Sequence, residues 1–88
     1  MTFKIQLAEI IERFGELSCH DVRTVCGNYC DSGDRRLRQL AQEYRLRKQI
    51  HDAYEYRDKW YYFKHGFRRF CGVWAREQQK RQHGRAAA

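Results

Sequence analysis

The spacing of apolar residues changes near residue 45, and this change limits the possible folds more than any other feature of the chain. Before it, apolar residues recur at the spacing of one helical face: Leu37, Leu40, Ala41 and Tyr44. After it, apolar and polar residues alternate over 46–51, as they do in a strand. A helix continued past Tyr44 would turn Leu46 toward water and Lys48 toward the core. We therefore expect the helix to end near Tyr44 or Arg45 and an extended segment to follow.

The extended segment is rich in aromatic residues and is divided by the polar tripeptide "RDK", residues 57–59. Aromatic side chains favour strands, and a short polar interruption favours a turn. We predict two antiparallel strands, residues 48–56 and 60–64. The second strand is aromatic on both faces, so one face needs a cover. The same aromatic block could stack on the bases of a single-stranded nucleic acid, but packing against helices is the commoner use of such strands.

Two further helices are expected before residue 31. The first has an apolar face and a glycine, Gly15, suited to end it; the face is Phe3, Leu7, Ile10, Ile11 and Phe14. The second begins after Ser18, whose side chain can form a reciprocal cap with Asp21. Its apolar face is Val22, Val25 and Cys26, and Gly27 with Asn28 ends it. Asp31 and Asp34 repeat the capping pattern before Leu37.

Helical spacing returns after Gly66, and it predicts a C-terminal amphipathic helix over residues 66–79. Its apolar face is Phe67, Phe70, Cys71 and Trp74. This helix is the expected cover for the second aromatic face, in the same chain or from a second copy. A homodimer through Phe67, Phe70 and Trp74 is therefore a candidate assembly. Residues 1–65 are expected to form the main domain, and residues 80–88, which lack an apolar period, a disordered tail.

Basic residues are concentrated in the C-terminal two-thirds of the chain. Lys and Arg number 18 against 11 Asp and Glu, yet residues 1–34 hold 3 basic and 6 acidic residues and the remainder holds 15 and 5. This distribution predicts a basic surface that meets an acidic partner. No apolar run reaches the about 18 residues of a membrane span, and charged residues interrupt the place where a signal peptide needs its apolar core. We expect a cytoplasmic protein with no membrane partner, associated with the nucleoid if it binds DNA.

The order of these elements resembles the winged helix-turn-helix family of DNA-binding domains. The resemblance lies in "LSCHDVRTVCG", "GDRRLRQLAQEY" and "EYRDKWYYF", and it covers about residues 3–64. The sequence style is similar to small phage or prophage winged-helix proteins, in which an Arg-Arg-Leu-Arg-x-Leu stretch opens the recognition helix. The resemblance implies an α+β fold: a three-helix winged helix-turn-helix with a two-stranded antiparallel β-hairpin wing, here with an extra C-terminal helix. The link "GNYCDSG" is longer than the turn of the simplest helix-turn-helix units.

The resemblance implies sequence-specific binding of double-stranded DNA, by a small transcriptional regulator or a phage-type accessory factor. Arg and Gln can each pair with one base through two hydrogen bonds. The candidates for base contact lie on the outward side of the third helix: Arg35, Arg38, Gln39 and Gln42. The candidates for phosphate contact are Arg36, Arg45, Arg57, Lys59, Lys64, Arg68 and Arg69. Six phosphate contacts would give a slope of log affinity against log salt of about −5.

The cysteines and the histidine beside the first of them are zinc-ligand types: Cys19, His20, Cys26, Cys30 and Cys71. Their spacing lacks the close cysteine pair of a zinc knuckle. We therefore expect no cofactor or metal, a site built from the four cysteines being a weak alternative. No phosphate loop, paired-carboxylate motif or metal motif accompanies them, so the sequence does not predict an enzyme.

Three other interpretations of the basic helix remain. The chain could be a protein-interaction module that uses a winged-helix scaffold to bind or inhibit an acidic protein partner, and it would then bind DNA little at physiological salt. RNA is a less favoured partner, because helix entry suits the major groove of B-form DNA better than that of A-form RNA. The basic face could also be an ordinary solvated surface.

Overall fold

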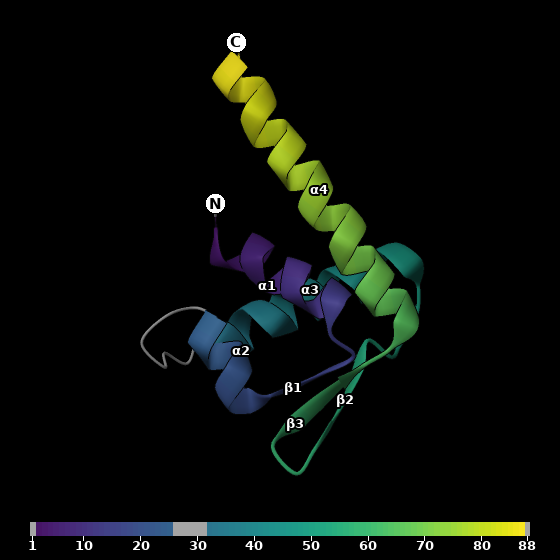
Figure 1. Cartoon of the computed structure of the whole chain (residues 1–88). Helices are drawn as coiled ribbons and strands as arrows, with labels where there is room; N and C mark the ends of the chain where they lie inside the picture. Colours follow the sequence, from purple (N-terminus) through teal and green to yellow (C-terminus); the bar gives the residue numbers. More distant parts are fainter. Residues whose placement is uncertain (1, 26–31, 88) are drawn as a thin grey trace.

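The computed structural model describes residues 2–25 and 32–87 (Figure 1). Within these residues the chain is an α+β fold of four helices and a three-stranded antiparallel sheet. The helices are α1 (Phe3–Arg13), α2 (Cys19–Val25), α3 (Ser32–Lys48) and α4 (His65–Ala87). The strands are β1 (Glu16–Ser18), β2 (Tyr54–Arg57) and β3 (Trp60–Phe63), in the order β1-β3-β2. The expected α+β class is confirmed, but the sheet has one strand more than the sequence predicts.

The additional strand, β1, lies where the sequence predicts only the junction between two helices. Gly15, expected to close α1 in a left-handed conformation, instead leads into β1, because Phe14 is already extended with φ −112° and ψ 133°. The Phe63 N–H donates to the Gly15 carbonyl at 2.9 Å, and Leu17 pairs with Tyr61 across the sheet. Three residues are too few to show alternation, so long-range pairing with β3 defines this strand.

The two predicted aromatic segments form the β2–β3 hairpin, but its strands are shorter than expected. Asp58 and Lys59 have φ of 53° and 64°, so both central turn residues are left-handed, as in a type I′ turn. Asp tolerates this conformation well, and the turn therefore forms without glycine. Residues 48–53, expected to be strand, instead contain the end of α3 and a loop.

A single core joins the helices to one face of the sheet. The four α3 residues predicted to be buried, Leu37, Leu40, Ala41 and Tyr44, are all buried. The face of α1 differs from the prediction: Ile5 and Ala8 are buried, whereas Phe3 and Phe14 are exposed. The difference arises because α1 packs against both α3 and α4, so its buried face is broader than one apolar stripe.

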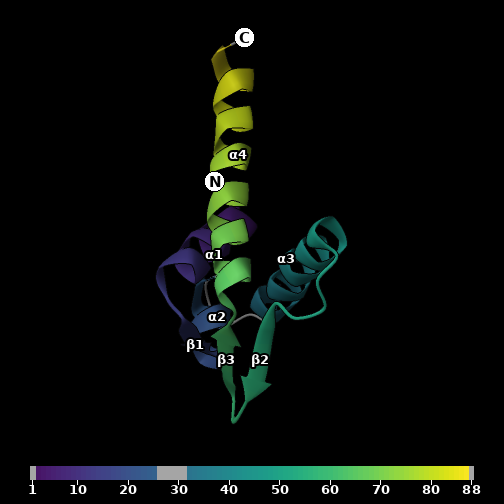
Figure 2. The ribbon, with the colours of Figure 1, turned by 90° about the vertical axis from the view of Figure 1, so that its right-hand side faces the viewer.

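The helix α3 continues one turn past the predicted end and reaches Lys48. Leu46 does point outward, with 73% of its surface exposed, so the predicted phase is correct although the predicted end is wrong. The reason lies at Lys48, which faces a cavity beside Tyr44 rather than packed core side chains. α3 and α4 diverge at this level (Figure 2). Gln49, with φ 55°, then ends the helix in a left-handed conformation.

The helix α4 is longer than the predicted span of 66–79, and it continues through the segment expected to be a tail. Its aromatic face, Phe67, Phe70 and Trp74, is buried within the same chain. The three side chains therefore do not form the exposed aromatic face through which a homodimer was expected. Phe67 covers the inner face of the sheet, 6.1 Å from Phe63 between ring centroids, whereas Phe70 packs against Tyr44 of α3 and Trp74 lies beside Lys4 of α1. Trp60 points to the other face and remains 40% exposed.

Candidate nucleic-acid interface

The start of α3 is fixed by one carboxylate that joins three elements. The Asp34 Oδ2 atom accepts a hydrogen bond and ion pair from Arg23 Nε of α2 at 2.8 Å. The Asp34 Oδ1 atom accepts a hydrogen bond from the Tyr61 hydroxyl of β3, also at 2.8 Å. The capping pattern in the sequence identifies Asp34 as a helix-start residue, but it gives no sign of these long-range partners. Asp34 therefore sets the position of α3 against both α2 and the sheet.

The backbones of α2 and α3 also touch directly, at Gly33. A Cβ atom at this position would lie 2.4 Å from the Val22 carbonyl oxygen, so only glycine fits without a shift of backbone. The predicted cap of α2 is confirmed nearby: the Ser18 hydroxyl accepts from the Asp21 N–H at 3.0 Å, and the Asp21 carboxylate accepts from the Ser18 N–H at 3.2 Å. The α2–α3 junction is thus held by close packing as well as by polar contacts.

Tyrosines on β2 and β3 complete this junction. Tyr61 lies 4.7 Å from Tyr56 and 5.2 Å from Tyr54 between ring centroids. Burial, together with the hydrogen bond to Asp34, raises the pKa of Tyr61 because both disfavour the phenolate. Burial also raises the pKa of Tyr54, against the opposing effect of the Arg45 and Arg38 guanidiniums. The Arg45 guanidinium also lies 5.8 Å from the Tyr54 ring centroid, so Arg45 lies on the side of α3 that faces β2.

The outward face of α3 presents the four base-contact candidates to solvent: Arg35, Arg38, Gln39 and Gln42. Across residues 2–25 and 32–87, none of these side chains makes a hydrogen bond or ion pair. The two carboxylates of α3 are engaged elsewhere, Asp34 at the junction and Glu43 with Arg47 at 2.9 Å. The outward face is therefore basic and rich in donors, and no acidic side chain lies on it.

The flanks of this face carry two phosphate-contact candidates in defined positions. The Arg36 guanidinium lies 5.4 Å from the Phe3 ring centroid, and its Nη1 donates to the Ser32 carbonyl at 3.4 Å. The Arg45 Nε donates to the His51 carbonyl at 2.8 Å, which leaves its other N–H groups available. Arg36 and Arg45 thus stand on opposite edges of the outward face.

The hairpin carries two more candidates, on its exposed end. Arg57 lies over the Tyr62 ring at 5.0 Å and pairs with Glu55 at 3.5 Å, so part of its charge is neutralised. Lys59 occupies the turn and is exposed. Figure 2 shows α3 and β2 on the same side of the molecule, apart from α1 and α4.

The remaining three phosphate-contact candidates lie elsewhere. Arg68 is committed to the protein itself, because its Nη2 donates to the carbonyls of Glu12 and Arg13 at 3.1 and 3.2 Å and so caps the C-terminus of α1. Arg69 lines a cavity that Lys48 also lines. Lys64 is exposed between β3 and α4. We therefore remove Arg68 from the set and assign Arg69 to a different surface. Lys64 is also set aside, because it lies at the end of β3 opposite the hairpin turn.

The cysteines can be placed only in part, because Cys26 and Cys30 lie outside the described residues. Cys71 is fully buried in the core, and burial raises the pKa of its thiol, so it is held as a small neutral side chain. Cys19 lies beside Tyr56, whose pKa is raised chiefly by desolvation and also by this thiol. Within the described ranges, no group of three His, Cys, Asp or Glu side chains has the arrangement of a metal site.

Comparison with known proteins gives no further identification. No protein-family model matches the chain, and no curated protein or solved structure matches it. Among the helices that the structure describes, none combines the length and the apolar character needed to cross a membrane. The functional argument therefore rests on the geometry of α3 and of the hairpin beside it.

Proposed function

We propose that the protein binds double-stranded DNA as a winged helix-turn-helix domain, with α3 in the major groove and the β2–β3 hairpin against the adjacent backbone. Three helices followed by a hairpin is the order of elements that the family resemblance implies. The biological role that fits is a small transcriptional regulator or a phage-type accessory factor. The observation that carries the proposal is the outward face of α3.

This face has the chemistry that base recognition requires. Arg35, Arg38, Gln39 and Gln42 are exposed and make no hydrogen bond or ion pair among the described residues, so they keep their donors and acceptors for a ligand. Arg can bind both acceptors of guanine, and Gln can bind the donor and acceptor of adenine. The four residues extend over two turns, about 10 Å of helix. A helix fits the major groove, which is about 12 Å wide.

The position of the face also favours DNA over an ordinary solvated surface. Asp34 and Gly33 fix the start of α3, so the reading side chains project from a rigid support. Arg45 lies beside Tyr54 of β2, so the helix and the hairpin can meet one duplex together. The four proposed phosphate contacts are Arg36, Arg45, Arg57 and Lys59. Four such contacts give a slope of log affinity against log salt of about −4.

The test is a salt-titrated fluorescence anisotropy assay on a duplex selected from a random pool. We expect Arg38→Ala to weaken binding to the selected duplex by about tenfold and to relax the preference at one position, because a two-bond contact to a base is lost. Arg13→Ala is the matched control, since it removes an exposed cation from α1, away from α3. A salt slope near zero, or equal weakening by Arg13→Ala and Arg38→Ala, would contradict the proposal.

A further inference from the structure

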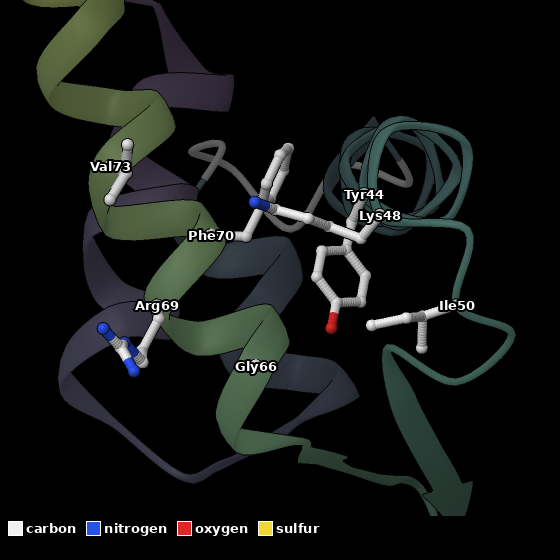
Figure 3. Close-up of a pocket in the computed structure, with 7 residues that line it drawn as sticks. All are labelled: Tyr44, Lys48, Ile50, Gly66, Arg69, Phe70 and Val73. Carbon is white, nitrogen blue, oxygen red and sulfur yellow. The ribbon is translucent and has the colours of Figure 1, made fainter.

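A groove runs between the end of α3 and the first half of α4. Its main part is a cavity of about 340 Å³ lined by Tyr44, Lys48, Ile50, Gly66, Arg69, Phe70 and Val73 (Figure 3). A smaller hollow of about 120 Å³ shares Lys48, Phe70 and Val73 with it and continues to Trp74 and Glu77. The two hollows form one continuous surface, which we call the α3–α4 groove. From Gly66 to Glu77 it follows about 16 Å of helix, or three turns.

The floor of the groove is apolar and partly exposed. Ile50 and Val73 have 44% and 49% of their surface exposed, and they lie on either side of the buried Phe70 and Tyr44. The Tyr44 ring borders the cavity (Figure 3), and within the described residues its hydroxyl makes no hydrogen bond. Clustered apolar side chains at a concave surface are typical of binding sites rather than of bare surface.

The rim of the groove is basic. Lys48 reaches across the gap toward Phe70 of α4, and Arg69 lies on the far side of α4 from Lys48 (Figure 3). Neither side chain has an ion-pair partner in residues 2–25 and 32–87. The carboxylate that borders the groove, Glu77, lies at its far end in the smaller hollow. The main cavity therefore has apolar walls, with Lys48 across its gap and Arg69 on the outer side of its α4 wall.

We propose that the α3–α4 groove binds an acidic amphipathic helix of a partner protein. A helix lying along three turns of α4 would place apolar side chains at i, i+3 or i+4, and i+7 against Ile50, Phe70 and Val73. Its flanking carboxylates would meet Lys48 and Arg69, and the Tyr44 hydroxyl could donate to one of them. The charge complementarity between this rim and an acidic peptide selects the occupant.

The groove and the DNA-binding face lie on different sides of α3. Lys48 faces the core side of the helix, where the core opens, whereas Leu46 and Gln42 face outward. A phosphate backbone would use the two cations but would gain nothing from the apolar floor. The proposal thus does not depend on DNA binding, and a complex of protein, duplex and peptide together is expected.

The probe is a synthetic helical peptide of about three to four turns with Leu at the anchor positions and Glu elsewhere. Its counterpart has Lys in place of every Glu. In titrations of the full-length, isotopically labelled protein, the Glu peptide should bind and the Lys peptide should not. The Glu peptide should change the NMR chemical shifts of Ile50, Val73 and their neighbours most. We expect the double variant Lys48→Ala with Arg69→Ala to weaken this binding at least tenfold, and Val73→Asp to abolish it.

Matched controls separate this site from the DNA-binding face. Arg35→Ala removes a cation at the opposite end of α3 and should leave peptide affinity unchanged. The Lys48→Ala/Arg69→Ala variant should in turn leave duplex affinity unchanged. All three substituted groove residues are exposed, and thermal melting verifies the fold. If Val73→Asp does not fold, the double variant Lys48→Glu with Arg69→Glu replaces it. This variant should bind the Lys peptide more tightly than the Glu peptide.

Four results would overturn the proposal. The first is no binding of the Glu peptide, and the second is equal binding of the two peptides. The third is concentration-dependent self-association that Val73→Asp removes, which would assign the groove to a second copy of the chain. The fourth is a loss of duplex affinity in Lys48→Ala/Arg69→Ala as large as in Arg38→Ala, which would assign the two cations to DNA.

Discussion

The two ends of α3 are held in different ways. At its start, Gly33 lies against the Val22 backbone, and Asp34 binds both Arg23 and Tyr61. At its end, Lys48 faces a cavity, and Leu46 is exposed to solvent. The start of α3 is therefore closely packed, whereas its end borders a cavity that can hold another side chain.

This difference divides the helix between two tasks. The base-contact candidates begin directly after the anchored end, where a fixed backbone limits the loss of side-chain and backbone freedom on binding. The groove opens at the other end, where side chains can adapt to a partner. A rigid reading surface and an adaptable docking surface can thus occupy one helix of 17 residues.

The largest expected effect tests the closed packing at the start of α3. In Gly33→Ala the new methyl group would lie 2.4 Å from the Val22 carbonyl oxygen, so α2 and α3 must move apart. We expect the free energy of unfolding to fall by about 3 kcal/mol, at the upper end for overpacking. Urea denaturation measures this change.

Gly15→Ala is the control for Gly33→Ala. A Cβ atom at Gly15 would meet only the Arg68 side chain, at an ordinary distance of 3.5 Å. Its effect on unfolding should stay within about 0.5 kcal/mol. Similar losses in both variants would show that the α2–α3 junction is not specially tight.

The next effect tests the polar contacts of the same end. Asp34→Ala removes the ion pair with Arg23 and leaves the half-buried Tyr61 hydroxyl without its acceptor. We expect a loss of about 2 kcal/mol in the free energy of unfolding. Asp52→Ala removes an exposed loop carboxylate and should change stability little. A variant of Asp34 as stable as the wild type would mean that these contacts do not anchor α3.

The sequence predicts the local features of α2 and α3 better than the long-range contacts that fix either end of α3. Local signals suffice for the Ser18–Asp21 cap, the buried face of α3 and the exposure of its four outward residues. Each depends on residues three or four positions apart, which a periodic pattern records directly. The fold class and the hairpin follow from the same kind of signal.

The features that were missed depend on contacts between distant residues. β1 exists because Leu17 pairs with Tyr61, and the groove exists because α4 diverges from α3 beyond Tyr44. The predicted end of α3 is wrong because α4 diverges there. A lysine on the core side of a helix is unfavourable only where packed side chains surround it, and Lys48 instead faces the open cavity. The base-contact prediction itself stays a prediction, since exposure alone does not identify a ligand.

A smaller effect is expected at alkaline pH, and it reports on the anchored end through Tyr61. Burial and the Asp34 carboxylate raise its pKa above the usual value near 10. The folded protein therefore holds this proton more tightly than the unfolded chain. The resulting stability is fully present below about pH 10 and is lost as pH rises above it, by at most about 1.4 kcal/mol per pH unit for one group.

Tyr61→Phe separates this contribution from those of other groups. The pKa values of Tyr54, Tyr56 and Cys71 are also raised, but these residues are present in both proteins, so most of their effect cancels in the difference. We expect the free energy of unfolding to fall less steeply between about pH 10 and 11 in Tyr61→Phe. Parallel pH profiles in urea denaturation would contradict the role given to Tyr61.

The smallest effect tests the open end, and its sign is opposite. In Lys48→Leu an apolar side chain replaces a cation beside Ile50, Phe70 and Val73. We expect a gain of about 1 kcal/mol in the free energy of unfolding, since apolar surface is removed from water without overpacking. Lys80→Leu, on an exposed turn of α4 beyond the groove, is the control and should give no gain. A loss of stability in Lys48→Leu would show that the end of α3 has no room for an apolar group, and the contrast between the two ends of the helix would then be wrong.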